Sequence, residues 1–126
     1  MRTLAFDSTG PILTVGAAQE ERIIGRKDAR AHRSRGNLLD LLIDSLLDEI
    51  GWHRRDVEGL GLLTGPGSLT ATRLGWATAA GWAQATGIPV AGWTVPIAQR
   101  RRLQGDAIGG VCCIHYRGDT FLLYDL

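Results

Sequence analysis

With 126 residues, the chain is long enough for one modest domain with its own hydrophobic core. Its net charge of +1 argues against a surface built for nucleic acid or membrane as a general partner. It has neither an apolar run long enough to span a bilayer nor the long apolar start of a secretory signal, so a cytoplasmic protein is expected. Two adjacent thiols in an apolar run, Cys112 and Cys113, favour a reducing compartment.

Three short apolar runs come first and predict an antiparallel meander of strands over Thr3–Phe6, Ile12–Ala18 and Arg22–Arg26. The polar, arginine-rich stretch over residues 28–36 predicts a loop. Leucine and isoleucine then recur at helical spacing, which predicts a helix over Asn37–Ile50 that ends at Gly51.

Strand and helix patterns alternate through the next part of the chain. They predict a strand over Val57–Leu63, a helix over Thr70–Thr86, a strand over Ile88–Trp93 and a short helix over Pro96–Leu103. In the last of these, the arginines 100–102 form a solvated face. The order β-β-β-α-β-α-β-α indicates an α/β fold with a mixed five-stranded sheet and helices on its faces.

The last part of the chain predicts a β-hairpin with strands over Val111–Tyr116 and Phe121–Leu126, joined at Gly118-Asp119. With Gly105 as the linker position, residues 1–104 form one lobe and residues 105–126 begin a second, truncated lobe. Alternatively, the hairpin pairs with the edge of the first sheet or with another chain, because an isolated hairpin is only marginally stable in water.

The helix predicted over Thr70–Thr86 carries one charged residue, Arg73, whereas a surface helix normally has a polar face. Its small residues recur at four-residue spacing, which lets a neighbouring helix approach closely. Its two tryptophans cannot both lie against one sheet face, so the helix needs cover on two sides. Either the first helix supplies all of that cover, or the pair forms a protein interface, which we favour. The predicted interface residues are Leu38, Leu42, Leu46, Ala71, Gly75, Trp76, Ala79 and Trp82.

Two loops follow predicted strands and could hold a nucleotide or a phosphate. Glycines allow a tight turn, and a helix N-terminus attracts anions. The residues are Asp7, Ser8, Thr9, Gly65, Gly67 and Ser68. Structural roles are the alternative, and each loop taken alone favours them: Asp7 and Ser8 can cap their own turn, and Ser68 or Thr70 can cap the following helix.

No catalytic residue and no metal ligand is assigned from the sequence. The Gly65–Ser68 stretch lacks the Gly-Lys-Ser/Thr ending of a P-loop, and Ser68 lacks the setting of a hydrolase nucleophile. The fourth strand ends in Thr64 rather than a carboxylate, and the three histidines are isolated from one another along the sequence.

Several stretches together resemble the TsaB (YeaZ) family. They are Asp7-Ser8-Thr9 after the first strand, Ala31-His32-Arg33-Ser34-Arg35, the run from Gly65-Pro66-Gly67-Ser68 through Thr70-Ala71-Thr72-Arg73-Leu74-Gly75, and Gly87-Ile88-Pro89-Val90. The resemblance implies an actin-like ATPase, ribonuclease H-like fold with two lobes. It also implies a dimerisation subunit of the machinery that forms N6-threonylcarbamoyladenosine in tRNA.

The same resemblance implies partners rather than chemistry. A TsaD-like paralogue would carry the metal and the transfer reaction, and the histidine pair of that paralogue has no counterpart in residues 94–98. The implied further partner is a TsaE-like ATPase, with a homodimer as the alternative in isolation and tRNA contacted only through the complex. No resident cofactor and no peptidase activity are implied, although ATP could bind at the partner interface. The competing hypothesis is a small ATP- or phosphate-binding enzyme domain that uses the two loops.

The chain departs from the family pattern in three places. Leu69 stands where an aromatic residue is common, and Gly10 where another hydroxyl residue is frequent. Family members also continue for roughly another domain's length of chain.

Overall fold

Alternating burial along the first strands defines the two faces of the main sheet. The computed structural model describes residues 1–31, 35–103, 111–117 and 120–125. In β1 (Arg2–Asp7), Leu4 and Phe6 are buried while Ala5 between them is exposed. Because successive residues of a strand point to opposite faces, this alternation separates a buried face from an open one.

The five strands have the spatial order β3-β2-β1-β4-β5. The hairpin strands β2 (Ile12–Gln19) and β3 (Arg22–Arg30) are antiparallel to their neighbours, while β4 (Gly59–Leu63) and β5 (Val90–Trp93) extend the sheet in parallel from β1. The predicted mixed five-stranded sheet is therefore confirmed.

One boundary differs from the sequence-based prediction. The strand β3 continues to Arg30, so the loop expected to begin at Asp28 begins later. Asp28 lies opposite Thr14 in the β2–β3 register, and the Thr14 hydroxyl donates to its carboxylate at 2.5 Å. Arg26 also binds this carboxylate. These partners let polar residues continue the strand, and they hold the pKa of Asp28 below its ordinary value, chiefly through the Thr14 hydrogen bond.

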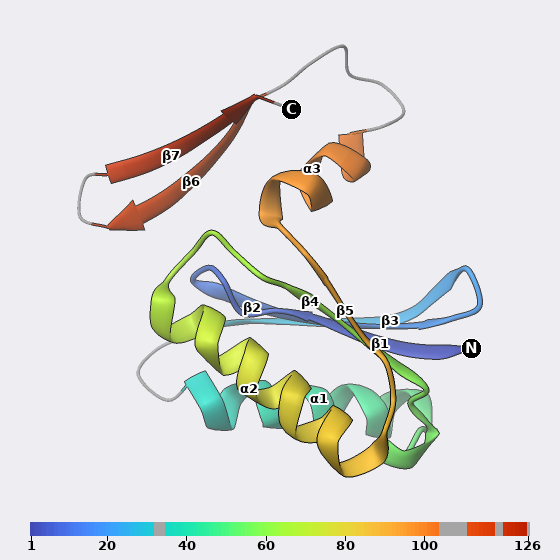
Figure 1. Ribbon diagram of the computed structural model, residues 1–126. Coiled ribbons are helices and arrows are strands. Elements are labelled where there is room, and N and C mark those ends of the chain that lie inside the picture. Colours follow the sequence, from blue (N-terminus) through green and yellow to red (C-terminus); the bar gives the residue numbers. More distant parts are fainter. Residues whose placement is uncertain (32–34, 104–110, 118–119, 126) are drawn as a thin grey trace.

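Two helices, α1 (Arg35–Ile50) and α2 (Leu69–Thr86), cover the same face of the sheet (Figure 1). Between them and the sheet lies the core, which includes Leu4, Phe6, Leu13, Val15, Leu39, Ile43, Leu46, Leu60 and Leu62. Both helices end at a glycine in the left-handed region, Gly51 (φ 73°) and Gly87 (φ 74°), where other residues are strained. The predicted end of the first helix at Gly51 is confirmed, and the second helix ends at Thr86 as predicted.

The chain leaves β5 for α3 (Val95–Leu103) and then the hairpin strands β6 (Val111–Arg117) and β7 (Thr120–Asp125). Both elements lie on the side of the five-stranded sheet opposite α1 and α2 (Figure 1). The hairpin forms a separate antiparallel sheet, as predicted. Its predicted turn, the linker at Gly105 and the last residue, Leu126, lie outside the described residues. The division into two lobes stays a prediction.

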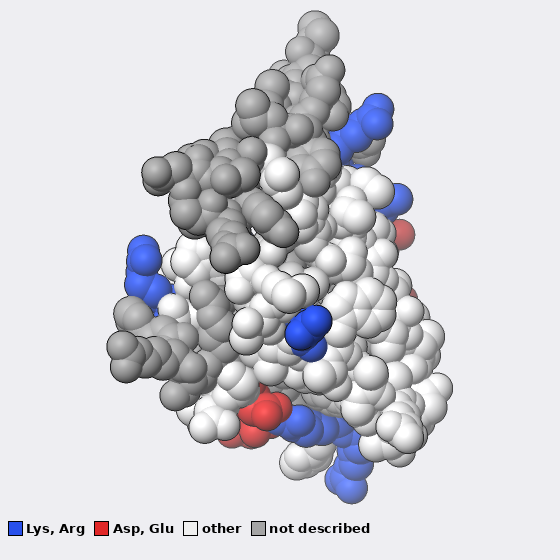
Figure 2. All heavy atoms as spheres, turned by 60° about the vertical axis from the view of Figure 1, so that its left-hand side comes forward, with Lys and Arg blue, Asp and Glu red and all other residues white. Residues whose placement is uncertain are grey.

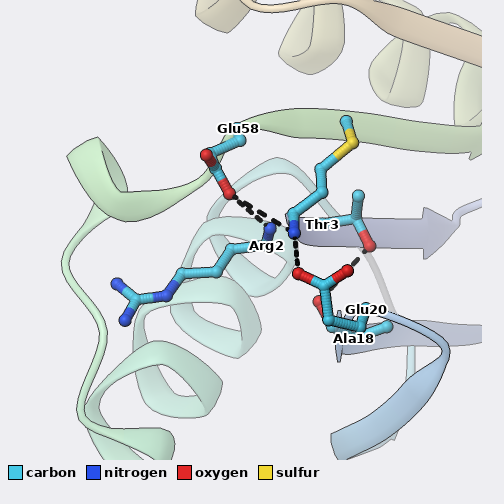
Figure 3. A network of polar contacts seen from close by, with 6 residues as sticks. Arg2, Thr3, Ala18, Glu20 and Glu58 are labelled. Atoms are coloured by element: carbon cyan, nitrogen blue, oxygen red, sulfur yellow. Dashed lines mark hydrogen bonds and ion pairs between the residues drawn. The ribbon is translucent and has the colours of Figure 1, made fainter.

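Polar contacts at the start of β1 tie it to both neighbouring strands (Figure 3). The ammonium group of Met1 pairs with Glu20 at the β2–β3 turn and lies 4.0 Å from Glu58, just before β4. The backbone N–H of Arg2 donates to Glu58 at 2.6 Å.

No helix in the described parts of the chain is both long and apolar enough to cross a membrane.

Candidate functional site

The two loops singled out in the sequence meet at the carboxyl ends of β1 and β4. The backbone N–H of Ser68 donates to the carbonyl of Thr9 at 3.1 Å. A side chain at Gly67 would place its Cβ 2.4 Å from the same carbonyl oxygen, so only glycine fits there. Because the two strands are parallel and adjacent, their ends open at one edge of the sheet. The six predicted loop residues therefore come together.

Several polar groups of these loops form hydrogen bonds within the chain itself. The Ser8 hydroxyl is buried and donates to the carbonyl of Ala71 in α2 at 2.7 Å. The Ser68 hydroxyl accepts from the backbone N–H of Ala71 at 3.5 Å and caps α2. Together with the bond from Ser68 to Thr9, these contacts occupy donors that a bound phosphate would need. The loops thus act as a hydrogen-bonded joint between β1 and α2.

Asp7 supports its own turn at the end of β1. One carboxylate oxygen, Oδ1, accepts from the backbone N–H of Thr9 at 2.8 Å and from the Thr9 hydroxyl at 2.7 Å. Asp7 lies opposite Thr14 in the β1–β2 register. Within the residues that the structure describes, no three His, Cys, Asp or Glu side chains are grouped so that they could hold a metal ion. Asp7 is thus positioned as a turn residue.

The predicted interface residues divide into two groups. Leu46, Ala71, Gly75, Ala79 and Trp82 are buried within the chain itself, and Leu38 and Leu42 are partly buried against the core. The small residues of α2 allow a close approach, but the neighbour is the end of β1: a Cβ at Gly75 would lie 2.6 Å from the Ser8 hydroxyl oxygen. The part of these residues in an interface with a partner stays a prediction.

Other apolar residues occupy the outer surface of the two helices. Trp76 is 50% exposed, Leu69 at the start of α2 is 65% exposed, and Leu41 on α1 is 65% exposed. With Arg73 and Ala80, Leu69 and Trp76 follow helical spacing and form one exposed stripe of α2. The side of the molecule on which α1 and α2 begin shows few charged side chains except near its edges (Figure 2). Leu41 and Leu69 are not among the predicted interface residues, because apolar spacing along a helix does not show which side stays exposed.

A charged clamp fixes the two helices to each other near the C-terminal end of α2. Arg54, in the short 3₁₀ helix η1 (Arg54–Asp56), donates to Asp44 at 2.8 Å and to Asp40 at 3.2 Å, both on α1. Its guanidinium carbon lies 5.1 Å from the centre of the Trp82 ring on α2. These carboxylates, Asp44 first, raise the pKa of Arg54, so it stays charged. The sequence did not predict this contact, because its groups are far apart along the chain.

A family model described as TsaD, tRNA N6-adenosine threonylcarbamoyltransferase, matches residues 21–94, which is more than half of the chain. The chain belongs to the TsaD family. The matched segment contains α1, β4 and α2, and with them the Gly65–Ser68 loop and the Arg54 clamp. No curated protein matches the chain at a significant level.

Solved structures place this TsaD-family chain in the expected fold. YeaZ from Pseudomonas aeruginosa superposes with a TM-score of 0.83 at 24% identity, over 98% of this chain and 58% of that one. A structure titled as an uncharacterized protein with similarity to peptidase YeaZ from Pseudomonas aeruginosa gives 0.86 at 24% identity, with the same coverage. RuvC from Thermus thermophilus gives 0.57 at 14% identity, over 83% of this chain and 70% of that one.

These likenesses confirm the actin-like, ribonuclease H-type fold that the sequence predicted. They also show that the TsaD-family chain spans less than two thirds of the length of the YeaZ chains.

Proposed function

We propose that this TsaD-family chain is a TsaB-type partner subunit. In this role it binds a TsaD-like threonylcarbamoyltransferase, acts in forming N6-threonylcarbamoyladenosine in tRNA, and does not itself catalyse transfer. The observation that carries the proposal is the exposed apolar stripe of α2, centred on the half-exposed Trp76. Tryptophan is enriched at the centres of protein interfaces, and an α2 with one charge does not suit a solvated surface.

The closed joint between the two loops supports the same proposal. Ser8 and Ser68 bind within the chain at the ends of β1 and β4, which leaves fewer donors there for a nucleotide or phosphate. The Arg54 clamp also supports the proposal, because it holds α1 against α2. The outer surface of the two helices then needs no rearrangement before a partner binds. A TsaE-like ATPase and tRNA would then join through the complex, in the cytoplasm.

The test is a pair of variants on the exposed surface of α2. Trp76→Asp should weaken binding to the TsaD-like chain of the same organism by roughly tenfold or more, because a central interface tryptophan contributes about 2 kcal/mol or more. Ala85→Asp is the matched control and should bind normally, because Ala85 is exposed on α2 but lies about half a turn round the helix from Trp76. Co-purification, calorimetry and the N6-threonylcarbamoyladenosine content of tRNA report the result. Unchanged binding by Trp76→Asp would show that this surface is not the interface.

The competing function, an ATP- or phosphate-binding enzyme domain, has a direct test of its own. The isolated chain would be titrated with ATP and magnesium in a calorimeter. Under the partner-subunit proposal no tight binding is expected, because the loop donors are occupied by the chain. Tight binding that Asp7→Ala abolishes would favour the enzyme instead.

A further inference from the structure

The exposed stripe of α2 contains one charged side chain, Arg73, and its neighbours on both sides along the stripe are large and apolar. Leu69 lies four residues before it and Trp76 three residues after it, and both are at least half exposed. Arg73 is itself exposed. A partner that covered these two apolar side chains would also remove water from the guanidinium group between them, which is costly for a charge that has no counter-ion.

Arg73 has no carboxylate partner among the described residues of its own chain. The ion pairs of the described residues all use other cations, and the Arg73 side chain forms neither an ion pair nor a hydrogen bond with those residues. Residues 59–105, which include β4, α2, β5 and α3, contain no acidic residue. A counter-ion for Arg73 therefore cannot come from α2 or from the strands on which it packs.

The neighbouring helix does not supply the charge either. Arg54 and Lys27 bind three of the four acidic residues of α1. The fourth, Asp48, lies in the last turn of α1, whereas Arg73 lies near the start of α2, and the two helices begin on the same side of the molecule (Figure 1). The positive charge of Arg73 is thus available to a group from outside the chain.

We propose that Arg73 is a specificity-determining residue of the partner interface, and that the TsaD-like partner places a carboxylate, from Asp or Glu, against its guanidinium group. This inference rests on the proposed function, which buries the stripe against that partner. A buried charge is tolerated when it is paired and hydrogen-bonded, and a planar guanidinium matches a carboxylate in a two-point contact. An apolar surface without such a carboxylate would leave Arg73 unpaired, so this residue discriminates between partners.

The first test measures how the TsaD-like chain of the same organism binds the Arg73→Met variant, by surface plasmon resonance. Methionine keeps an unbranched apolar side chain and removes the charge. Because the partner's carboxylate would then be buried and unpaired, binding should weaken about thirtyfold or more, mainly through faster dissociation. An arginine that stayed solvated at the rim of the interface would tolerate the same change.

Arg22→Met is the matched control, because it removes the same charge from β3, at the opposite edge of the sheet from β5. Arg22 is also exposed, so this variant has the same net charge as Arg73→Met but an unchanged α2. It should bind the partner normally. Circular dichroism of both variants establishes that they are folded.

A charge exchange then locates the carboxylate on the partner. Arg73→Glu should weaken binding about a hundredfold or more, because two like charges face each other. Each exposed Asp or Glu of the partner is changed to Arg in turn and tested against Arg73→Glu. One of these changes should restore binding to within about tenfold of the original Kd, because a contacting pair is energetically coupled and distant residues are not.

The outcomes separate this inference from the proposed function. Normal binding by Arg73→Met, or the failure of every partner substitution to rescue Arg73→Glu, would overturn the pairing. The partner-subunit proposal would still stand in that case if Trp76→Asp weakened binding. Unchanged binding by Trp76→Asp would instead remove the interface on which both proposals depend.

Discussion

At Gly75, α2 lies close against Ser8, the residue that follows β1. Its missing side chain makes room for the Ser8 hydroxyl, which uses that position to reach the carbonyl of Ala71. Phe6 also lies near the same point, 3.8 Å from a Cβ at Gly75. A glycine in the middle of a helix normally lowers its stability, and here it is explained by packing.

Substitution of this glycine should therefore destabilise the protein. Gly75→Ala gains helix propensity but forces the added methyl against the buried Ser8 hydroxyl, and we expect the free energy of unfolding to fall by about 1–2 kcal/mol. Gly81→Ala, also in α2, meets nothing within 4 Å and should raise it by up to about 1 kcal/mol. Urea unfolding followed by circular dichroism measures both. Equal stability of the two variants would contradict the packing explanation.

Among the elements, α1 and α2 depend on Arg54 for a contact that neither supplies alone. Arg54 comes from the connection between α1 and β4, and joins two carboxylates of α1 to the Trp82 ring of α2. Exposed ion pairs contribute little individually, but a planar guanidinium that binds two carboxylates and stacks on a ring combines several contacts. The clamp therefore sets how the two helices lie against each other.

Loss of the clamp should have a modest, salt-dependent effect. Arg54→Ala should lower the free energy of unfolding by about 1 kcal/mol. Arg54→Lys should restore less than half of the loss, because an ammonium group cannot match the fork geometry. The measurement is a double-mutant cycle with Asp44→Ala by urea unfolding at low and high salt. Additive effects in that cycle would mean that the Arg54–Asp44 contact contributes nothing.

Across the whole molecule, one hydrophobic core stands out among the residues whose burial the structure describes. Its buried residues run from Leu4 in β1 to Trp82 in α2, within the predicted lobe of residues 1–104. The hairpin forms its own sheet. The first lobe should therefore fold without the hairpin.

A chain shortened to residues 1–104 tests this separation. It should unfold cooperatively, with a midpoint within a few degrees of the full chain at low concentration, because the core remains complete. Differential scanning calorimetry measures the midpoint. A broad or absent transition would show that the hairpin is needed for the first lobe to fold.

The sequence by itself determined the element order and the fold class. Apolar spacing marked α1, the alternation of strands and helices indicated a mixed sheet, and Gly51 and Gly87 marked the helix ends. These features are local, because backbone angles and side-chain periodicity depend on near neighbours along the chain. The positions of the Asp7–Thr9 and Gly65–Ser68 loops directly after predicted strands were also local signals, whereas their convergence depends on the parallel pairing of β1 with β4.

Only the tertiary structure decided which surfaces are free. From the sequence, the small residues of α2 favoured a partner interface, whereas the structure places Ser8 beside Gly75 within the chain itself. The Arg54 clamp likewise depends on residues far apart in the sequence. Periodicity shows that a side chain has to be covered, but what covers it is fixed by packing between distant segments.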